Sequence, residues 1–215
     1  MNRKRKIILI VTAALLGAVA VGAGIFLAVR SHSRVPLVCL DAGHGGKDTG
    51  AVSGDRLEKD DNLKMTLAVG RILKEEGCRV VYTRKDDSTV SLEERYTLSN
   101  KKKATMFVAI HRNSAENESA NGIEAWIKST EPAPDKKLAK NILRQLDKVG
   151  FGANRGVSVG YRGDKTKNYA VNSGTNCKSC LLELGFLSNA EDNERFDRNF
   201  DAYAKAIAKG IMQSL

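Results

Sequence analysis

Four side chains that can bind a metal or move a proton lie near the ends of predicted structural elements: His44, Glu58, His111 and Glu183. His44 follows the first apolar run of the domain after a short turn, and Glu58 comes just before a predicted helix. His111 ends the apolar run 106–110. Two imidazoles and a carboxylate are a ligand set that zinc accepts, with a fourth position left for water.

Each of these three residues also has an ordinary structural explanation. A single histidine is more often hydrogen-bonded within the fold than bound to a metal. A glutamate such as Glu58 is favoured in the first turn of a helix by the helix dipole. The predicted position of all three residues at one edge of a sheet favours metal binding over a structural role. The carboxyl ends of parallel strands lie side by side there and form the crevice where such folds bind ligands.

Glu183 stands in the apolar segment 180–186 (CLLELGF). A carboxylate in such surroundings must be paired, bound to a metal or raised in pKa. A carboxyl group of raised pKa is suited to take a proton from water and to pass it to a leaving amine. The alternative is an internal salt bridge with Arg84 or Arg95. The residues alone favour neither explanation.

The elements that must position these residues follow from the hydrophobic pattern. Short apolar runs predict strands, apolar positions three and four residues apart predict helices, and Ser91 with Glu94 forms a capping box. The predicted strands are 37–40, 79–83, 106–110, 122–127, 157–159 and 180–184, and the predicted helices are 60–76, 91–102, 135–149 and 200–211. Strands that alternate with helices predict an α/β fold with a largely parallel sheet.

The N-terminal segment is of another kind. Residues 7–29 carry no charge, and as a helix they reach roughly 34 Å, enough to span a hydrocarbon core of about 30 Å. We expect a cytoplasmic basic tail (1–6), a transmembrane anchor (7–29), a linker (30–35) and a catalytic domain (36–215). Four cations before the span and two after it place the domain on the extracytoplasmic side of the cell membrane. The alternative is secretion after cleavage of a signal peptide.

The formal net charge of +10 is concentrated in this same segment. Residues 1–35 hold six of the 35 Lys and Arg and no acidic residue, so the remaining chain carries only +4. Its basic stretches are short and have no interleaved aromatic residues, which excludes nucleic acid as the expected partner.

The four cysteines allow two explanations. Cys177 and Cys180 form a C-x-x-C pair, and a disulfide is possible in an exported domain. Cys39 and Cys180, however, stand in apolar runs, where a free cysteine behaves as a small buried hydrophobic residue. We favour the second explanation.

Five ordered motifs resemble the zinc-dependent N-acetylmuramoyl-L-alanine amidase family over essentially all of residues 36–215. They are 40–46 (LDAGHGG), 58–60 (EKD), 82–84 (YTR), 109–113 (AIHRN) and 182–189 (LELGFLSN). The resemblance implies a mixed, mainly parallel sheet flanked by helices. It also implies hydrolysis of the amide bond between N-acetylmuramic acid and L-alanine in bacterial peptidoglycan.

The same resemblance implies residue roles. His44, Glu58 and His111 would bind Zn²⁺, and Glu183 would be the catalytic acid and base. One departure lies beside the metal ligands: Arg112 occupies a position where the family commonly has a small residue. We expect Arg112 to alter the fit of the substrate.

Three alternatives remain at this point. The first is a zinc peptidase that cuts within the stem peptide. The second is a catalytically silent domain that binds peptidoglycan or a partner through Arg112 and its basic surface. The third is an amidase that needs an activator protein, with a mobile loop in the Gly-rich segment 150–163.

Overall fold

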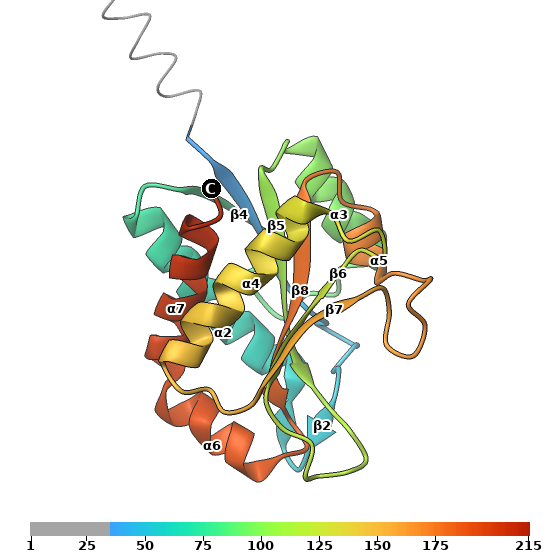
Figure 1. Cartoon of the computed structure of the whole chain (residues 1–215), viewed down its shortest axis with the longest axis vertical. Coiled ribbons are helices and arrows are strands. Elements are labelled where there is room, and N and C mark those ends of the chain that lie inside the picture. The colour runs from blue at the N-terminus through green and yellow to red at the C-terminus, as the bar shows by residue number, and fades with distance from the viewer. Residues whose placement is uncertain (1–34) are drawn as a thin grey trace, which may run out of the picture. The chain divides into compact units, whose positions relative to one another are not determined.

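A six-stranded mixed sheet forms the centre of the computed structural model, which describes residues 35–215 (Figure 1). The strand order is β4-β1-β5-β8-β6-β7. The strands are β1 (Leu37–Ala42), β4 (Arg79–Tyr82), β5 (Met106–Asn113), β6 (Ile123–Ile127), β7 (Asn154–Val159) and β8 (Lys178–Phe186). Strands β4, β1, β5 and β8 are parallel to one another, while β6 is antiparallel to β8 and parallel to β7. The prediction of a mixed, mainly parallel sheet is confirmed.

Helices cover both faces of this sheet. They are α2 (Glu58–Glu75), α3 (Leu92–Lys101), α4 (Ala133–Lys148), α5 (Ala170–Ser173), α6 (Ala190–Arg198) and α7 (Phe200–Met212). Successive side chains of a strand point to opposite faces. In β5, Met106, Val108 and Ile110 therefore join the larger apolar core with α2, α4 and α7. Phe107 and Ala109 point the other way, into a smaller cluster that includes Val171 of α5. Figure 1 shows α4 and α7 together on one side of the strands and α3 with α5 on the other.

Most predicted elements are present, with different ends. Helix α2 begins at Glu58 rather than Asp60, and the capping box at Ser91 is formed, with Glu94 N–H donating to the Ser91 hydroxyl over 3.2 Å. The hairpin β2 (Val52–Ser53) and β3 (Arg56–Leu57) was not predicted because two-residue strands have no visible period. Helix α6 was not predicted because it buries few side chains and has no apolar stripe.

The Gly-rich segment 150–163, considered above for a mobile loop, agrees with the strand predicted at 157–159. It contains β7, and the turn that follows is closed by backbone hydrogen bonds between Tyr161 and Asp164 of 3.2 and 2.9 Å. All four cysteines are free, and Cys39 and Cys180 are buried, as expected of small apolar residues. Cys180 belongs to the larger core, whereas Cys177 packs against the smaller cluster, so the C-x-x-C pair is divided between the two faces of the sheet.

The predicted basic tail, anchor and linker fall almost entirely on residues outside the described part of the chain. Within residues 35–215, no helix has the length and apolar character that crossing a membrane requires.

Candidate metal centre and active site

The site is built on a row of three side chains at one edge of the sheet. In the strand register, His111 of β5 pairs with Glu183 of β8, and Glu183 pairs with Glu124 of β6. Directly paired residues on neighbouring strands point to the same face. That face is the one with the smaller apolar cluster, because Leu181 and Trp126 lie two residues from Glu183 and Glu124. The pairing therefore brings an imidazole and two carboxyl groups together, although they come from distant parts of the chain.

His44 reaches the same edge from the loop after β1. Its φ is 61°, a left-handed conformation that is uncommon for a residue with a side chain. Two buried guanidinium groups hold this loop by its carbonyl oxygens. Arg84 donates to the carbonyls of Ala42 and Gly43 over 3.0 and 2.9 Å, and Arg95 donates to the carbonyl of His44 over 2.8 Å. These contacts fix the backbone that carries the imidazole.

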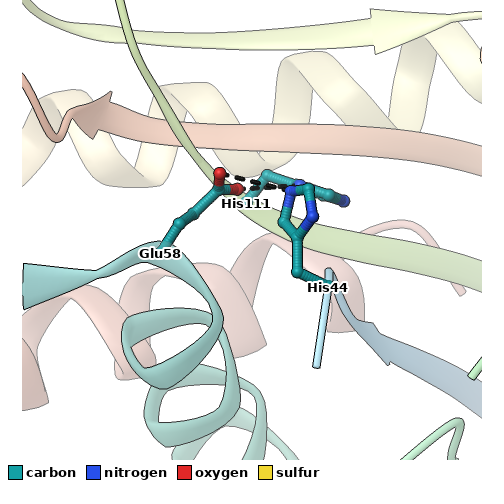
Figure 2. A group of neighbouring side chains, drawn as sticks. All are labelled: His44, Glu58 and His111. Atoms are coloured by element: carbon teal, nitrogen blue, oxygen red, sulfur yellow. Dashed lines mark hydrogen bonds and ion pairs between the residues drawn. The ribbon is translucent and has the colours of Figure 1, made fainter. Parts of the chain in front are cut away.

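His44, Glu58 and His111 form one compact cluster (Figure 2). The Nε2 atom of His44 lies 3.2 Å from Oε2 of Glu58, and Nδ1 of His111 lies 3.0 Å from Oε1 of the same carboxylate. Each residue offers one ligand atom to a metal, and these three atoms all lie within 4.8 Å of one another. The structure thus brings together the three predicted metal ligands.

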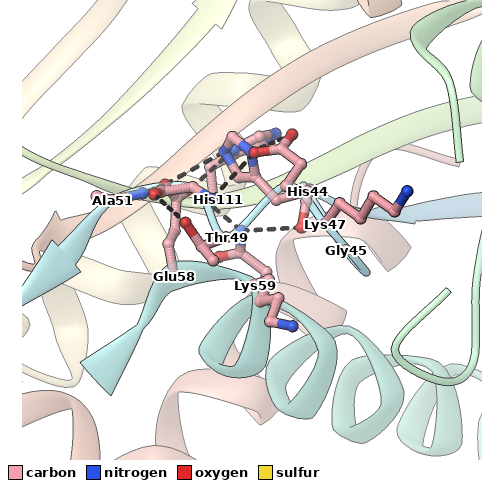
Figure 3. A network of polar contacts seen from close by, with 12 residues as sticks. His44, Gly45, Lys47, Thr49, Ala51, Glu58, Lys59 and His111 are labelled. Atoms are coloured by element: carbon pink, nitrogen blue, oxygen red, sulfur yellow. Dashed lines mark hydrogen bonds and ion pairs between the residues drawn. The ribbon is translucent and has the colours of Figure 1, made fainter. Parts of the chain in front are cut away.

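The carboxylate of Glu58 is fixed by the backbone around it (Figure 3). Its Oε2 accepts the Ala51 N–H over 2.9 Å, and its Oε1 accepts the Arg112 N–H over 3.1 Å. Burial alone would raise its pKa, but the hydrogen bonds to His111 and His44, with the charges of these residues, lower the pKa well below its usual range. Glu58 is therefore a permanent anion in this cluster.

The surroundings of the cluster fit a metal ion. Asp48 Oδ2 lies 2.8 Å from Nδ1 of His44, so Nε2 is left to face the cluster. A carboxylate on the outer nitrogen is the usual support for a histidine that binds a metal. Burial opposes protonation of His44, but hydrogen bonds and charges from Glu58 and Asp48 raise its pKa to about 9. A Cβ atom on Gly43 would lie 2.2 Å from the ring of His111, so the ring fits only because this residue is glycine.

Glu183 has very different surroundings in the same cleft. It is buried, and its Oε2 has no hydrogen-bond partner in the described part of the chain. The salt bridge considered from the sequence is wrong, because Arg84 donates to backbone carbonyls and Arg95 pairs with Asp41 over 2.8 Å. Burial is the largest cause that raises the pKa of Glu183 to about 7, although the charge of His111 opposes it.

Arg112 does not face the cleft with its side chain. Its guanidinium is buried, donates to Asp61 and Asn193 over 2.6 Å each, and lies 4.4 Å from the centre of the Phe196 ring. The expectation that Arg112 alters substrate fit or binds a partner is therefore wrong for its side chain. Only its backbone N–H takes part in the site, by donating to Glu58.

The cluster and Glu183 open into one cavity of about 780 Å³. It is also lined by Leu92 at the start of α3 and by Tyr161, Arg162 and Tyr169 between β7 and α5. The cavity therefore lies on the face of the sheet that carries the smaller apolar cluster.

Three polar residues of the site were not predicted from the sequence. Asp48 lies in a Gly-rich loop, where polar residues are expected in any case. Glu124 had one usable signal, since it is a single acid between Ile123 and Ala125 in an apolar strand. Arg162 gave no signal, because only the fold decides where its turn lies.

The fold and the site define a class: α/β proteins in which a two-histidine, one-glutamate cluster at the carboxyl ends of parallel strands can hold a metal beside a separate buried carboxyl group. The sequence profile of the N-acetylmuramoyl-L-alanine amidases matches residues 38–213. The chain belongs to this family of cell-wall hydrolases.

Two relatives are similar over most of this chain. The uncharacterised Bacillus subtilis protein YqiI is 36% identical over 197 residues, which cover 88% of this chain and 92% of YqiI. The probable cell wall amidase LytH of Staphylococcus aureus is 36% identical over 159 residues, 72% of this chain but only 49% of LytH.

Solved structures show the same fold. The catalytic domain of CwlV, an N-acetylmuramoyl-L-alanine amidase from Bacillus (Paenibacillus) polymyxa var. colistinus, is 36% identical with a TM-score of 0.74, over 83% of this chain and 97% of that one. The CwlD amidase of Clostridioides difficile, in complex with the GerS lipoprotein, is 30% identical with a TM-score of 0.76, over 83% of this chain and 98% of that one.

Proposed function

We propose that this amidase hydrolyses the bond between N-acetylmuramic acid and L-alanine in peptidoglycan, with Zn²⁺ held by His44, Glu58 and His111 and with Glu183 as the acid and base. One observation carries the proposal: a metal-ligating cluster lines the same cavity as a buried carboxyl group whose Oε2 has no hydrogen-bond partner in the described part of the chain. Family membership gives the substrate and the bond that is cut.

The three ligands do separate work in this mechanism. Glu58 supplies the negative charge, and His44, supported by Asp48, supplies an oriented imidazole. His111 supplies the second imidazole next to Glu183 in the strand register. When bound, zinc polarises the scissile carbonyl and makes water acidic enough to attack near neutral pH.

Glu183 moves the proton. A carboxyl group with a pKa near 7 is ionised often enough to accept a proton from the attacking water and acidic enough to return it. The acceptor on return is the amine of L-alanine, which leaves only when protonated. Because Oε2 of Glu183 has no hydrogen-bond partner within residues 35–215, its carboxylate is free to make these contacts.

The test is the analysis of products from purified peptidoglycan by mass spectrometry. The purified full-length chain, in detergent and loaded with zinc, is expected to release intact stems that begin with a free L-alanine amine. Chelation is expected to stop the release, and added zinc to restore it. Release of stem fragments instead would identify a peptidase, and bound zinc without any product would point to a silent domain or to a missing activator.

Localisation and partners extend the same proposal. The uncharged segment 7–29 and the cations that flank it support an anchor that holds the domain on the extracytoplasmic side, where the substrate is. Sequencing of the mature N-terminus from the membrane fraction separates an anchored chain from a secreted one. An activator protein is the second partner of this proposal; CwlD, which has the same fold, has been solved in complex with the GerS lipoprotein.

A further inference from the structure

We propose that Arg162 binds the free carboxylate of the residue that follows L-alanine in the stem peptide, and so makes the enzyme prefer an acidic residue there over its amidated form. The inference rests on the amidase activity proposed above. It concerns a residue outside the five motifs that define the family resemblance.

Arg162 lies close to the reacting groups. Its Nη2 donates to Asn113 Oδ1 over 2.6 Å and to Glu124 Oε1 over 3.1 Å. Asn113 is two residues from His111, and Glu124 is the strand partner of Glu183. Paired residues on neighbouring strands lie about 5 Å apart, so the guanidinium is within roughly 10 Å of the acid and base.

The turn that carries Arg162 is fixed to the sheet before any substrate arrives. Gly160 N–H donates to the carbonyl of Ile127 over 2.9 Å, and the turn is closed between Tyr161 and Asp164. Further along, Asn168 accepts the Ser129 N–H over 2.7 Å and donates to the Ser129 hydroxyl over 3.1 Å. An arginine whose backbone is held in this way loses less conformational freedom when it binds an anion, which favours tight binding.

The charges around Glu124 leave Arg162 able to bind a second anion. Oε1 of Glu124 already accepts from Asn113 Nδ2 over 2.7 Å and from Trp126 Nε1 over 3.1 Å, while Oε2 accepts from Arg155 over 3.4 Å. One carboxylate thus faces two guanidinium groups. The Arg162 side chain is 45% exposed and lines the cavity. Besides those of Nη2, the one further hydrogen bond of its side chain within residues 35–215 is a long one of 3.4 Å, from Nη1 to the Ser114 carbonyl.

A stem peptide whose second residue is acidic would offer the matching anion at the right distance. Successive residues of an extended peptide are about 3.5 Å apart, so a carboxylate on the second residue lies within roughly 10 Å of the scissile bond. A guanidinium matches a carboxylate in charge and in the geometry of its donors. A neutral amide in the same position offers one acceptor and no charge.

The experiment measures binding of two product tripeptides, L-alanyl-γ-D-glutamyl-L-lysine and L-alanyl-D-isoglutaminyl-L-lysine, to the full-length chain by calorimetry. In both the γ-carboxyl group is in a peptide bond, so the two differ only in the free α-carboxylate of the second residue. The acidic peptide is expected to bind about tenfold more tightly, the low end for a charge-assisted hydrogen bond. In Arg162→Gln the two affinities should become equal, while the affinity for the amidated peptide is unchanged.

Arg155→Gln is the matched control. Arg155 also pairs with Glu124 and its side chain is also 45% exposed, but it does not line the cavity. The control should keep the tenfold preference, and both variants should unfold at the same temperature as the wild type to within a few degrees. Equal loss of preference in both variants would overturn the proposal, and so would equal affinities in the wild type.

The binding assay also separates this inference from the amidase activity. Binding of products requires no turnover. A wild-type chain that prefers the acidic peptide but releases no stems would contradict the proposed activity and leave the role of Arg162 supported.

Discussion

The two sides of one cleft place a glutamate carboxyl group in opposite environments. One side, the metal side, is formed by the loop after β1 and the start of α2. There the Glu58 carboxylate accepts hydrogen bonds from backbone N–H groups and contacts two imidazoles, and its pKa is lowered. On the side formed by β8, the Glu183 carboxyl group is buried, Oε2 has no partner within residues 35–215, and its pKa is raised to about 7.

This difference shows how a fold assigns roles to identical residues. A carboxylate surrounded by donors stays ionised at all relevant pH values and is suited to hold a cation. A carboxyl group without donors exchanges its proton near neutral pH and is suited to acid and base catalysis. Each side can be tested separately, beginning with the change expected to have the largest effect.

Loss of a ligand should abolish the function of the metal side. His111→Ala removes one of three ligands and is expected to weaken zinc binding by more than about a hundredfold, since changes to mere supporting residues already cost 10- to 100-fold. Activity should fall to background with it. Metal analysis after dialysis measures the first effect and release of stems the second. Retention of one equivalent of tightly bound zinc would show that the cluster is not the metal site.

A change to Glu183, on the other side of the cleft, should leave metal binding intact. Glu183→Gln is expected to keep its zinc but to lower turnover about 100- to 10,000-fold, because only proton transfer is removed. Replacement by alanine should also retain zinc and lose turnover. Full activity in either variant, with zinc present, would rule out Glu183 as the acid and base.

The pH dependence of stability should reveal the buried carboxyl group without any turnover. Because the pKa of Glu183 rises from 4.5 to about 7 on folding, the folded metal-free protein binds more protons than the unfolded chain between these values. The free energy of unfolding should therefore fall as pH rises through this window, by about 3 kcal/mol in total.

The comparison between variants isolates this effect. Glu183→Gln lacks the titrating group, so its loss of stability between pH 4.5 and pH 8 should be smaller than that of the wild type by this amount. Denaturant unfolding at several pH values measures the difference. Identical pH profiles for both proteins would contradict the raised pKa.

The smallest expected effect is a loss of zinc affinity caused by crowding of the His111 ring. In Gly43→Ala the new Cβ atom would lie 2.2 Å from the His111 ring, so the ring must move. We expect zinc affinity, measured against a competing chelator, to fall about 10- to 100-fold, as for other changes that disturb a ligand's orientation.

Gly54→Ala is the control for this change. Gly54 has a φ of 57°, and a Cβ atom added to it would meet no atom within 4 Å, so alanine there costs about 1 kcal/mol of backbone strain and touches nothing. Its zinc affinity should equal that of the wild type. An equal loss of affinity in both variants would mean that general destabilisation, not the His111 ring, is responsible.

Much of the fold could be predicted because its signals are local. The apolar runs around Val108 and Leu182 and the capping box at Ser91 are properties of neighbouring residues, and the structure contains all three elements. The hairpin at Val52 and helix α6 had no such signal, since they are short or bury little apolar surface.

The candidate site divides in the same way. The sequence by itself determined which residues could bind a metal or move a proton, since His44, Glu58, His111 and Glu183 stand out by type and by their place beside apolar runs. It also determined that Glu183 needed a special environment, because a carboxylate among apolar residues must have one.

Only the tertiary structure decided what that environment is. In the sequence, Arg84 and Arg95 were equally good partners for Glu183. In the fold, their N–H groups donate instead to backbone carbonyls and to Asp41. It also placed Arg162 beside Glu124. The physical reason is that hydrogen bonds and ion pairs depend on contacts of a few ångströms between residues far apart in the chain, and the packing of strands, helices and turns, rather than local composition, sets those contacts.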